Sequence, residues 1–219
     1  MLKHTVVTVF AVALSTTAFG QAKFYAEQSV LGWTSTTSET KPDGGTAVKS
    51  SGTSMDTMAD SLRLGANVDK MSFYVYPTTN THVELGYWVM DNLEAGLGLS
   101  LNSTTSKVGD VKSNSANNHY GVWGTYYMPM GSASLEASFA LMMGSNTGKN
   151  TDAAGVETKT NSTSTDISLG ANYVMPLAKN FSWLGGFSYA MKNGEDKEGK
   201  TKTTGSELGL NLTSLRWMW

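Results

Sequence analysis

In several segments of the chain apolar residues alternate with polar ones. Six charged residues occupy polar positions of this pattern, each next in sequence to at least one apolar residue. They are five acids and one cation: Glu84, Glu94, Glu136, Asp166, Glu207 and Arg216. Because an enclosed charge needs a partner or water, residues of this type predict a polar network inside the fold. Two interpretations stay open, a network that fills the interior and a lining that selects solutes in a narrow pore. The excess of acids leaves the network short of cations. Protonated carboxylates, water in the interior, or Lys and Arg side chains from the loops must make up the difference.

Catalytic and cofactor chemistry finds little support in the sequence. Apart from His4, the histidines are His82 and His119, and both fall on predicted strands away from an evident exposed serine–acid pair. A nucleophile–histidine–carboxylate set is therefore not expected, and we predict that the protein is not an enzyme. The chain has no cysteine and no His cluster with metal-ligand spacing, so neither a metal nor a cofactor is expected.

The elements that carry the charged residues are predicted to be β-strands. Between residues 93 and 102, apolar residues at odd positions alternate with small, polar or charged residues at even positions. A strict period of two is typical of a strand with one apolar and one polar face. The pattern predicts eight strands. The second ends at about 89 and has no defined start, and the other seven lie at about 23–35, 93–102, 118–128, 134–141, 166–173, 181–189 and 205–219.

The connections between these strands alternate in length. Short turns are predicted at 90–92, 129–132 and 176–180, and long polar loops at about 36–70, 103–117, 145–163 and 192–204. Short turns on one side and long loops on the other are typical of transmembrane β-barrels. The predicted fold class is therefore all-β, a transmembrane antiparallel up-and-down barrel of about eight strands.

Two segments interrupt the regular pattern. Residues 55–68 fit either a short helix or an extra strand with Leu62, Leu64, Ala66 and Val68 on one face; with 71–76 as a strand, this gives ten strands as the alternative. In the last strand the apolar positions change from even to odd, which predicts a bulged residue near Thr213 or Ser214.

The first 20 residues resemble a secretory signal. Lys3 and His4 precede an apolar run, and a small-residue cleavage site follows it, with cleavage expected after Gly20 or, as the second choice, after Ala22. Residues 21–219 then form the barrel domain. Removal of Lys3 leaves 15 basic and 18 acidic residues, so no basic patch is expected to bind nucleic acid.

Two runs resemble a known superfamily. Residues 86–98, Gly-Tyr-Trp-Val-Met-Asp-Asn-Leu-Glu-Ala-Gly-Leu-Gly, and residues 209–215 resemble hairpins of small bacterial outer-membrane β-barrels of the OmpX- and OmpW-like type. The final Trp219 is similar to the terminal aromatic residue, usually phenylalanine, that the barrel-assembly machinery reads. The resemblance covers about residues 83–219 and implies location in the bacterial outer membrane, in contact with lipid.

The resemblance also carries expectations about function. It implies a structural, membrane-organising role, with ring-shaped homo-oligomers such as pentamers that enclose lipid. The outward small residues Gly124, Ala137 and Gly185 would permit close contact between subunits. A porin-like narrow channel for small solutes is the alternative, and an outer-membrane enzyme is the third, weakest candidate.

Overall fold

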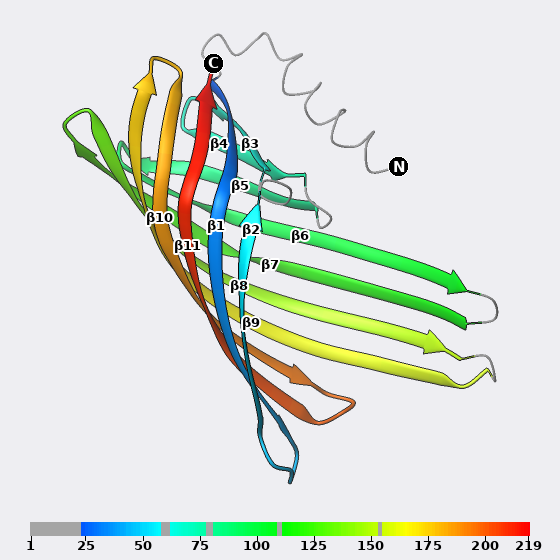
Figure 1. Ribbon diagram of the computed structural model, residues 1–219. Helices are drawn as coiled ribbons and strands as arrows, with labels where there is room; N and C mark the ends of the chain where they lie inside the picture. Colours follow the sequence, from blue (N-terminus) through cyan, green and yellow to red (C-terminus); the bar gives the residue numbers. More distant parts are fainter. Residues whose placement is uncertain (1–22, 58–61, 78–80, 109–110, 153–154) are drawn as a thin grey trace.

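The computed structural model describes residues 23–57, 62–77, 81–108, 111–152 and 155–219, and every regular element in them is a strand (Figure 1). The predicted signal at 1–20 lies outside these ranges. In chain order the strands are β1 (Lys23–Pro42), β2 (Val48–Thr57), β3 (Leu62–Val68), β4 (Met71–Tyr76), β5 (Thr81–Met90), β6 (Leu93–Val108), β7 (Val111–Met130), β8 (Ala133–Thr151), β9 (Glu157–Ala178), β10 (Phe181–Asp196) and β11 (Thr201–Met218). Among the described residues, no helix is long and apolar enough to cross a membrane.

All strand pairings are antiparallel, and the last strand pairs with the first. Consecutive strands from β3 to β11 pair with one another, and β11 pairs along the whole of β1. The other edge of β1 is shared, because its first residues pair with β3 and its later residues pair with β2. Since β2 pairs only with β1, ten of the eleven strands form a ring of pairings and β2 lies outside it.

The prediction of about eight strands is wrong. Residues 62–68 and 71–76 are the strands β3 and β4, as the ten-strand alternative required, and β2 is one strand more. The sequence of β2, VKSSGTSMDT, lacks a clear alternation of apolar and polar residues. A strand with water on both faces needs no apolar face, so periodicity did not reveal it.

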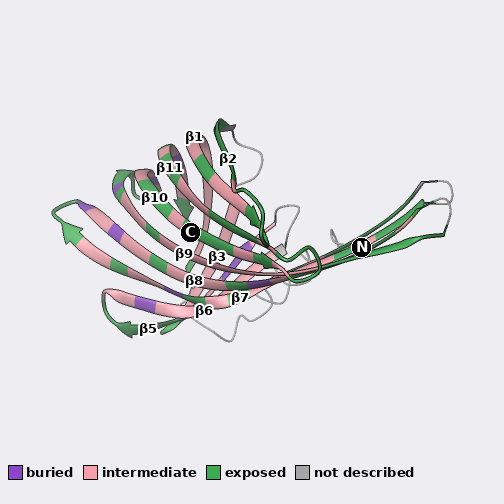
Figure 2. Cartoon of the chain, turned by 90° about the horizontal axis from the view of Figure 1, so that it is seen from below, coloured by how far each residue is buried: buried purple, intermediate pink, exposed green. Residues whose placement is uncertain are grey.

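The segments predicted as long loops are mostly strand (Figures 1 and 2). They extend the ring into two projecting sheets. We call the first the β6–β9 arm (residues 102–108, 111–118, 144–151 and 157–165) and the second the β1–β11 arm (34–42, 48–55, 192–196 and 201–207). The arms are joined on one side, where residues 192–196 of β10 pair with 162–166 of β9. On the other side they separate, since β3, β4 and β5 do not extend between β2 and the outer half of β6 (Figure 1).

The opposite end of the sheet has the short connections that the sequence predicts. The turns between β5 and β6, between β7 and β8, and between β9 and β10 each occupy two residues. Gly131, in the second of these turns, has a φ of 68°, a backbone conformation that glycine adopts without steric cost. The predicted bulge in the last strand is also present, because both neighbouring ladders omit Leu212 from their register.

The interior of the short-turn end is filled by large side chains. Tyr74, Trp123 and Leu184 are buried there. The Trp123 ring lies 2.9 and 2.7 Å from where a Cβ on Gly86 and Gly96 would be. These two glycines therefore provide the space that the indole occupies, and a side chain at either position would displace it. The core is thus the inside of the ring, at the level of the short turns.

Candidate functional site

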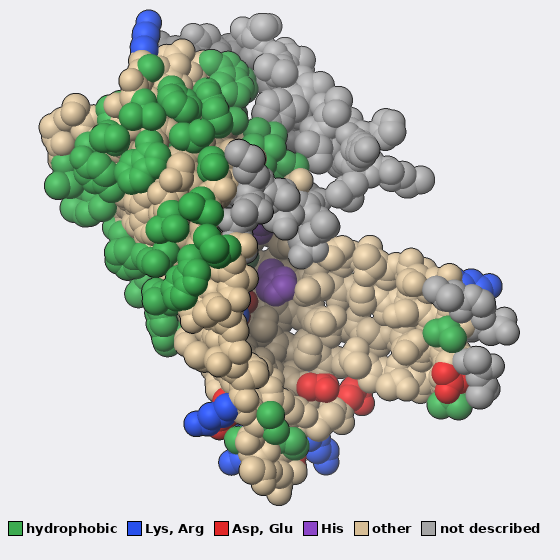
Figure 3. Space-filling view, viewed as in Figure 1, with side chains coloured by type: hydrophobic (Ala, Val, Ile, Leu, Met, Phe, Trp, Pro, Cys, Tyr) green, Lys and Arg blue, Asp and Glu red, His purple; other side chains and the backbone are tan. Residues whose placement is uncertain are grey.

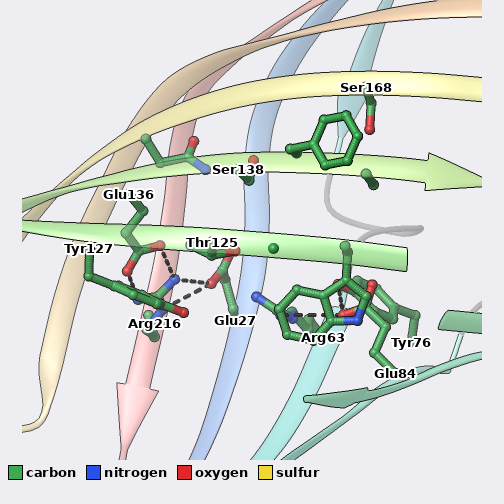
Figure 4. A pocket seen from close by; sticks show the side chains of 15 residues that line it. Glu27, Arg63, Tyr76, Glu84, Thr125, Tyr127, Glu136, Ser138, Ser168 and Arg216 are labelled. Carbon is green, nitrogen blue, oxygen red and sulfur yellow. Dashed lines mark hydrogen bonds and ion pairs between the residues drawn. The ribbon is translucent and has the colours of Figure 1, made fainter. Parts of the chain in front are cut away.

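Arg216 joins three strands across the interior (Figure 4). From β11, its Nε and Nη2 atoms donate to Oε2 of Glu27 on β1, at 2.9 and 2.7 Å. Its Nη1 and Nη2 atoms also donate to the two carboxylate oxygens of Glu136 on β8, at 2.6 and 2.9 Å. All three side chains are largely buried. One guanidinium therefore neutralises part of the charge of two carboxylates through paired, geometrically matched hydrogen bonds.

A second cluster surrounds Arg63 on β3. Its Nη2 atom lies 3.4 Å from Oε2 of Glu84, and its guanidinium stacks over the Tyr74 ring at 3.9 Å from the centroid. Glu84 also accepts a hydrogen bond from the hydroxyl of Tyr76 at 3.2 Å and contacts Nε2 of His82 at 3.1 Å. Cation–π stacking and ion pairing together hold this cation inside the barrel.

Glu94 on β6 is fully buried and is held by hydroxyl groups. Tyr74 and Tyr127 donate to its two carboxylate oxygens at 2.7 and 2.9 Å, and Ser72 donates to one of them as well. Three donors from β4 and β7 thus satisfy a carboxyl group that faces no guanidinium directly. Ser72 and Tyr74 share one carboxylate oxygen, whereas Tyr127 is the donor to the other. Loss of the Tyr127 hydroxyl would therefore leave a buried acceptor unsatisfied, which costs about 1–3 kcal/mol.

A small cavity of about 200 Å³ separates the two arginine clusters. Arg63, Trp123, Glu136 and Arg216 are among the residues that line it. Two buried donors beside it, Nε of Arg63 and Nε1 of Trp123, have no hydrogen-bond partner among the described residues. Because sites for drug-sized ligands occupy about 300–1,000 Å³, this cavity has room for water or a very small solute.

The structure places the six predicted charged residues in two groups. Glu84, Glu94, Glu136 and Arg216 lie in the interior network described above. Asp166 lies next to the β6–β9 arm, and Glu207 lies in the β1–β11 arm. There Glu207 accepts from Nζ of Lys192 at 2.5 Å, and this pair is partly exposed. The six residues therefore do not form a single network.

Sequence reasoning missed two residues that the network depends on, Glu27 and Arg63. Arg63 alternates with Leu62 and Leu64 in β3, so its inward direction could have been read if that segment had been assigned as a strand. Glu27 lies in a strand whose alternation is imperfect, and two register shifts between Ser29 and Gly32 explain why. The cations of the interior carboxylates are thus Arg63 and Arg216 of the barrel strands, whereas Glu207 is paired by Lys192, from a segment predicted as a loop.

The histidines do not form a catalytic constellation. His82 contacts Glu84, while His119 lies on the other side of β6, near Ser164 across Gly144. Within the described residues, no hydrogen-bonded chain links a serine, a histidine and a carboxylate, and no three His, Cys, Asp or Glu residues lie where they could hold a metal ion. Gly185, predicted as an outward small residue that would permit subunit contact, is covered by the Trp183 ring, which lies 2.5 Å from where a Cβ on Gly185 would be.

The outer surface of the short-turn end is apolar, in contrast to the interior (Figure 3). Leu97 is 63% exposed, and many other large apolar side chains on the same surface are exposed as well. In Figure 3 the arms are mostly uncharged polar surface, with charges near their ends. Trp219 lies at the seam, which we define as the pairing of the last strand, β11, with the first, β1. Its backbone exchanges two hydrogen bonds of 2.9 Å with Phe24 of β1.

Comparison with known proteins identifies the fold. The family model described as outer membrane protein beta-barrel domain matches residues 89–213, more than half of the chain. The outer membrane protease OmpT from Escherichia coli is similar in structure, with a TM-score of 0.51 and 9% identity over 90% of this chain and 96% of that one. At this identity the likeness concerns the fold alone.

Two further solved structures are also similar. Ail, the attachment invasion locus protein of Yersinia pestis, matches with a TM-score of 0.35 and 10% identity over 89% of this chain and 98% of that one. The neisserial surface protein A matches with a TM-score of 0.36 and 12% identity, over 90% and 98%. No curated protein sequence matches the chain. The chain belongs to the outer membrane protein beta-barrel domain family, and its location is the bacterial outer membrane.

Proposed function

We propose that the protein is an integral outer-membrane barrel with a structural and membrane-organising role, in which the charged interior closes the path through the ring. The observation that carries this proposal is the pair of arginine clusters. Arg216 reaches from β11 to β1 and β8, and Arg63 reaches from β3 to Glu84 on β5. With Glu94 and Trp123 beside them, these side chains occupy the cross-section at the level of the short turns.

The physical argument concerns what an ion would meet on its way through. Among the described residues, Arg63 and Arg216 form ion pairs with interior carboxylates, Glu94 is held by hydroxyl groups, and the cavity between the two clusters holds about 200 Å³. Opening a path would require the separation of buried ion pairs, and leaving one partner uncompensated costs about 3–5 kcal/mol. The apolar outer surface, meanwhile, places the same strands in hydrocarbon, where a ring of pairings satisfies every backbone group of a barrel.

A planar-bilayer recording of the purified full-length protein tests this proposal. We expect the wild type to give no large, stable single-channel conductance. The Glu27→Gln/Glu136→Gln/Arg216→Met variant removes the central charges and is expected to conduct more. A large, stable conductance of the wild type would favour the porin-like narrow channel, the second candidate. The observation in favour of that candidate is the cavity with two unpartnered donors, Arg63 Nε and Trp123 Nε1.

We also propose assembly into homo-oligomeric rings that enclose lipid, with the barrel-assembly machinery as the partner that inserts each subunit. Gly124 and Ala137 lie on the outer surface of adjacent strands, and their small side chains support close subunit contact. Electron-microscopy images of the detergent-solubilised protein should show a ring such as a pentamer with lipid at its centre. Single barrels at all concentrations would remove this part of the proposal. No catalytic role and no cofactor is proposed.

A further inference from the structure

The two faces of the β6–β9 arm differ completely in charge. On the inner face, three rows of opposed residues carry only hydroxyl, amide or glycine groups: Asn102, Asn117, Asn146 and Ser162; Thr104, Ser115, Gly148 and Thr160; Ser106, Ser113, Asn150 and Thr158. On the outer face of the same strands lie the lysines of the arm, Lys107, Lys112, Lys149 and Lys159, and Glu157 is the one acid among the described residues of that face. Both faces of this sheet are thus polar, but its charged residues lie on the outer face.

The lysines on the outer face stand directly opposite one another. Lys107 pairs with Lys112 across β6 and β7, and Lys149 pairs with Lys159 across β8 and β9. Like charges at directly opposed positions of an antiparallel pair are destabilising. Glu157 relieves part of this repulsion, since it lies 2.5 Å from Nζ of Lys149. Four cations against one acid nevertheless leave this face positive, so an anionic ligand would stabilise it.

An apolar groove lies on the same outer face, closer to the short turns. It encloses about 520 Å³ and is lined by β5–β8 side chains that include Leu97, Leu99, Tyr120, Val122, Leu141 and Met143. The register runs without a shift from this groove to the lysines in β6, β7 and β8. One ligand could therefore contact both, with an apolar part in the groove and an anionic part on the lysines.

The distance between the apolar groove and the lysines indicates which kind of ligand can contact both. Lys149 follows Met143 by six residues on β8, which corresponds to about 20 Å along a strand. Lysine side chains can extend back along the surface, but a glycerophospholipid carries its phosphate immediately beside its acyl chains. A lipid whose phosphates are borne on a saccharide headgroup spans the interval, and its sugars would meet Ser103, Asn118 and Thr147 on the way.

We propose that the outer face of the β6–β9 arm and the apolar groove below it bind a phosphorylated glycolipid of the outer leaflet, such as a lipopolysaccharide. This inference rests on the proposed function, because it requires the barrel to lie in the outer membrane with its arms projecting outwards. Acyl chains occupy the groove, and the two lysine pairs bind phosphates of the headgroup by charge-assisted hydrogen bonds.

The test uses the full-length folded protein in phosphatidylcholine nanodiscs and measures binding of purified rough lipopolysaccharide. The Lys149→Gln/Lys159→Gln variant is compared with Lys49→Gln/Lys202→Gln, which removes the same charge from the other arm. We expect the first variant to bind at least tenfold more weakly and the second to bind within twofold of the wild type. Equal losses in both variants, or no loss in either, would overturn the inference.

Three further probes separate the contributions of phosphate, sugar and acyl chain. Chemically dephosphorylated lipopolysaccharide, phosphatidylglycerol and the acyl-free core oligosaccharide should each bind the wild type at least tenfold more weakly than the intact glycolipid. If any of them binds as tightly, the combined site is wrong. A gel-mobility shift between unheated and boiled samples is recorded for every variant. Failure of the wild type to show this shift would contradict the barrel itself, whereas a shift without glycolipid binding would contradict only the inference.

Discussion

The short-turn end of the barrel and the β6–β9 arm are built from the same strands, yet they distribute polarity in opposite ways. Near the short turns the charges of β6–β8 face inwards and the outer face is apolar, as Glu94 and Leu97 on β6 illustrate. In the arm the inner face is uncharged and the lysines of the same strands face outwards. The surrounding medium, hydrocarbon or water, therefore sets which side chains each face of a continuous strand can carry.

The largest effect is expected where a charge of the interior is left without its partner. Arg216→Met deprives Glu27 and Glu136 of their cation, and breaking a buried pair in this way costs about 3–5 kcal/mol. Lys192→Met is the matched change near the arms, where its partner Glu207 is partly exposed, and there we expect a cost below about 1 kcal/mol. Urea unfolding in lipid vesicles measures both. Equal losses would remove the distinction between interior and arm.

The next effect concerns the outer face of a single strand. Leu97→Arg places a cation in hydrocarbon and should cost about 2–4 kcal/mol. Thr105→Arg lies on the same face of β6 in the β6–β9 arm and should change the free energy of unfolding by less than about 0.5 kcal/mol. Ser100→Arg, on the polar inner face, should also be tolerated far better than Leu97→Arg. The face assignment fails if the three variants are equally unstable.

A smaller effect is expected at the seam. Deletion of Trp219 removes the two backbone hydrogen bonds with Phe24, worth about 0.5–1.5 kcal/mol each, and the residue we expect the assembly machinery to read. The membrane-inserted fraction in cells should fall, while Trp219→Phe should restore it. Normal insertion of the truncated chain, measured by resistance to carbonate extraction, would argue against a role of the terminal aromatic residue.

The smallest effect belongs to the exposed ion pair of the β6–β9 arm. A hydrogen bond from Lys149 lowers the pKa of the Glu157 carboxyl. A lowered pKa in the folded state means that the pair adds stability above the ordinary glutamate pKa, and that this contribution is lost as the pH falls through the lowered value. An NMR titration should show the pKa of Glu157 rising in Lys149→Gln and remaining low in Lys49→Gln. An unchanged pKa in the first variant would show that the pair does not persist in solution.

The same comparison explains how much could be predicted from the sequence. Beside lipid, one face must be apolar, so alternation around Leu97, Leu141 and Leu169 predicts these strands and their inward acids. In the arms both faces meet water, so β2 and the outer halves of β6–β9 carry no period of two and were assigned to loops. Periodicity also cannot pair Arg216 with Glu27 and Glu136, because these contacts depend on which strands lie across the ring from one another.

The most direct test of the central claim, that lipid contacts the leucine-rich outer face and water contacts both faces of the arms, is a spin-label accessibility measurement. The chain has no cysteine, so single cysteines at Leu97, Thr105 and Thr104 can be labelled one at a time in reconstituted vesicles. The account predicts that the label at Leu97 is relaxed by oxygen, which concentrates in the bilayer, whereas the labels at Thr105 and Thr104 are relaxed by a water-soluble nickel chelate. A label at Leu97 that is relaxed mainly by the nickel chelate would contradict it.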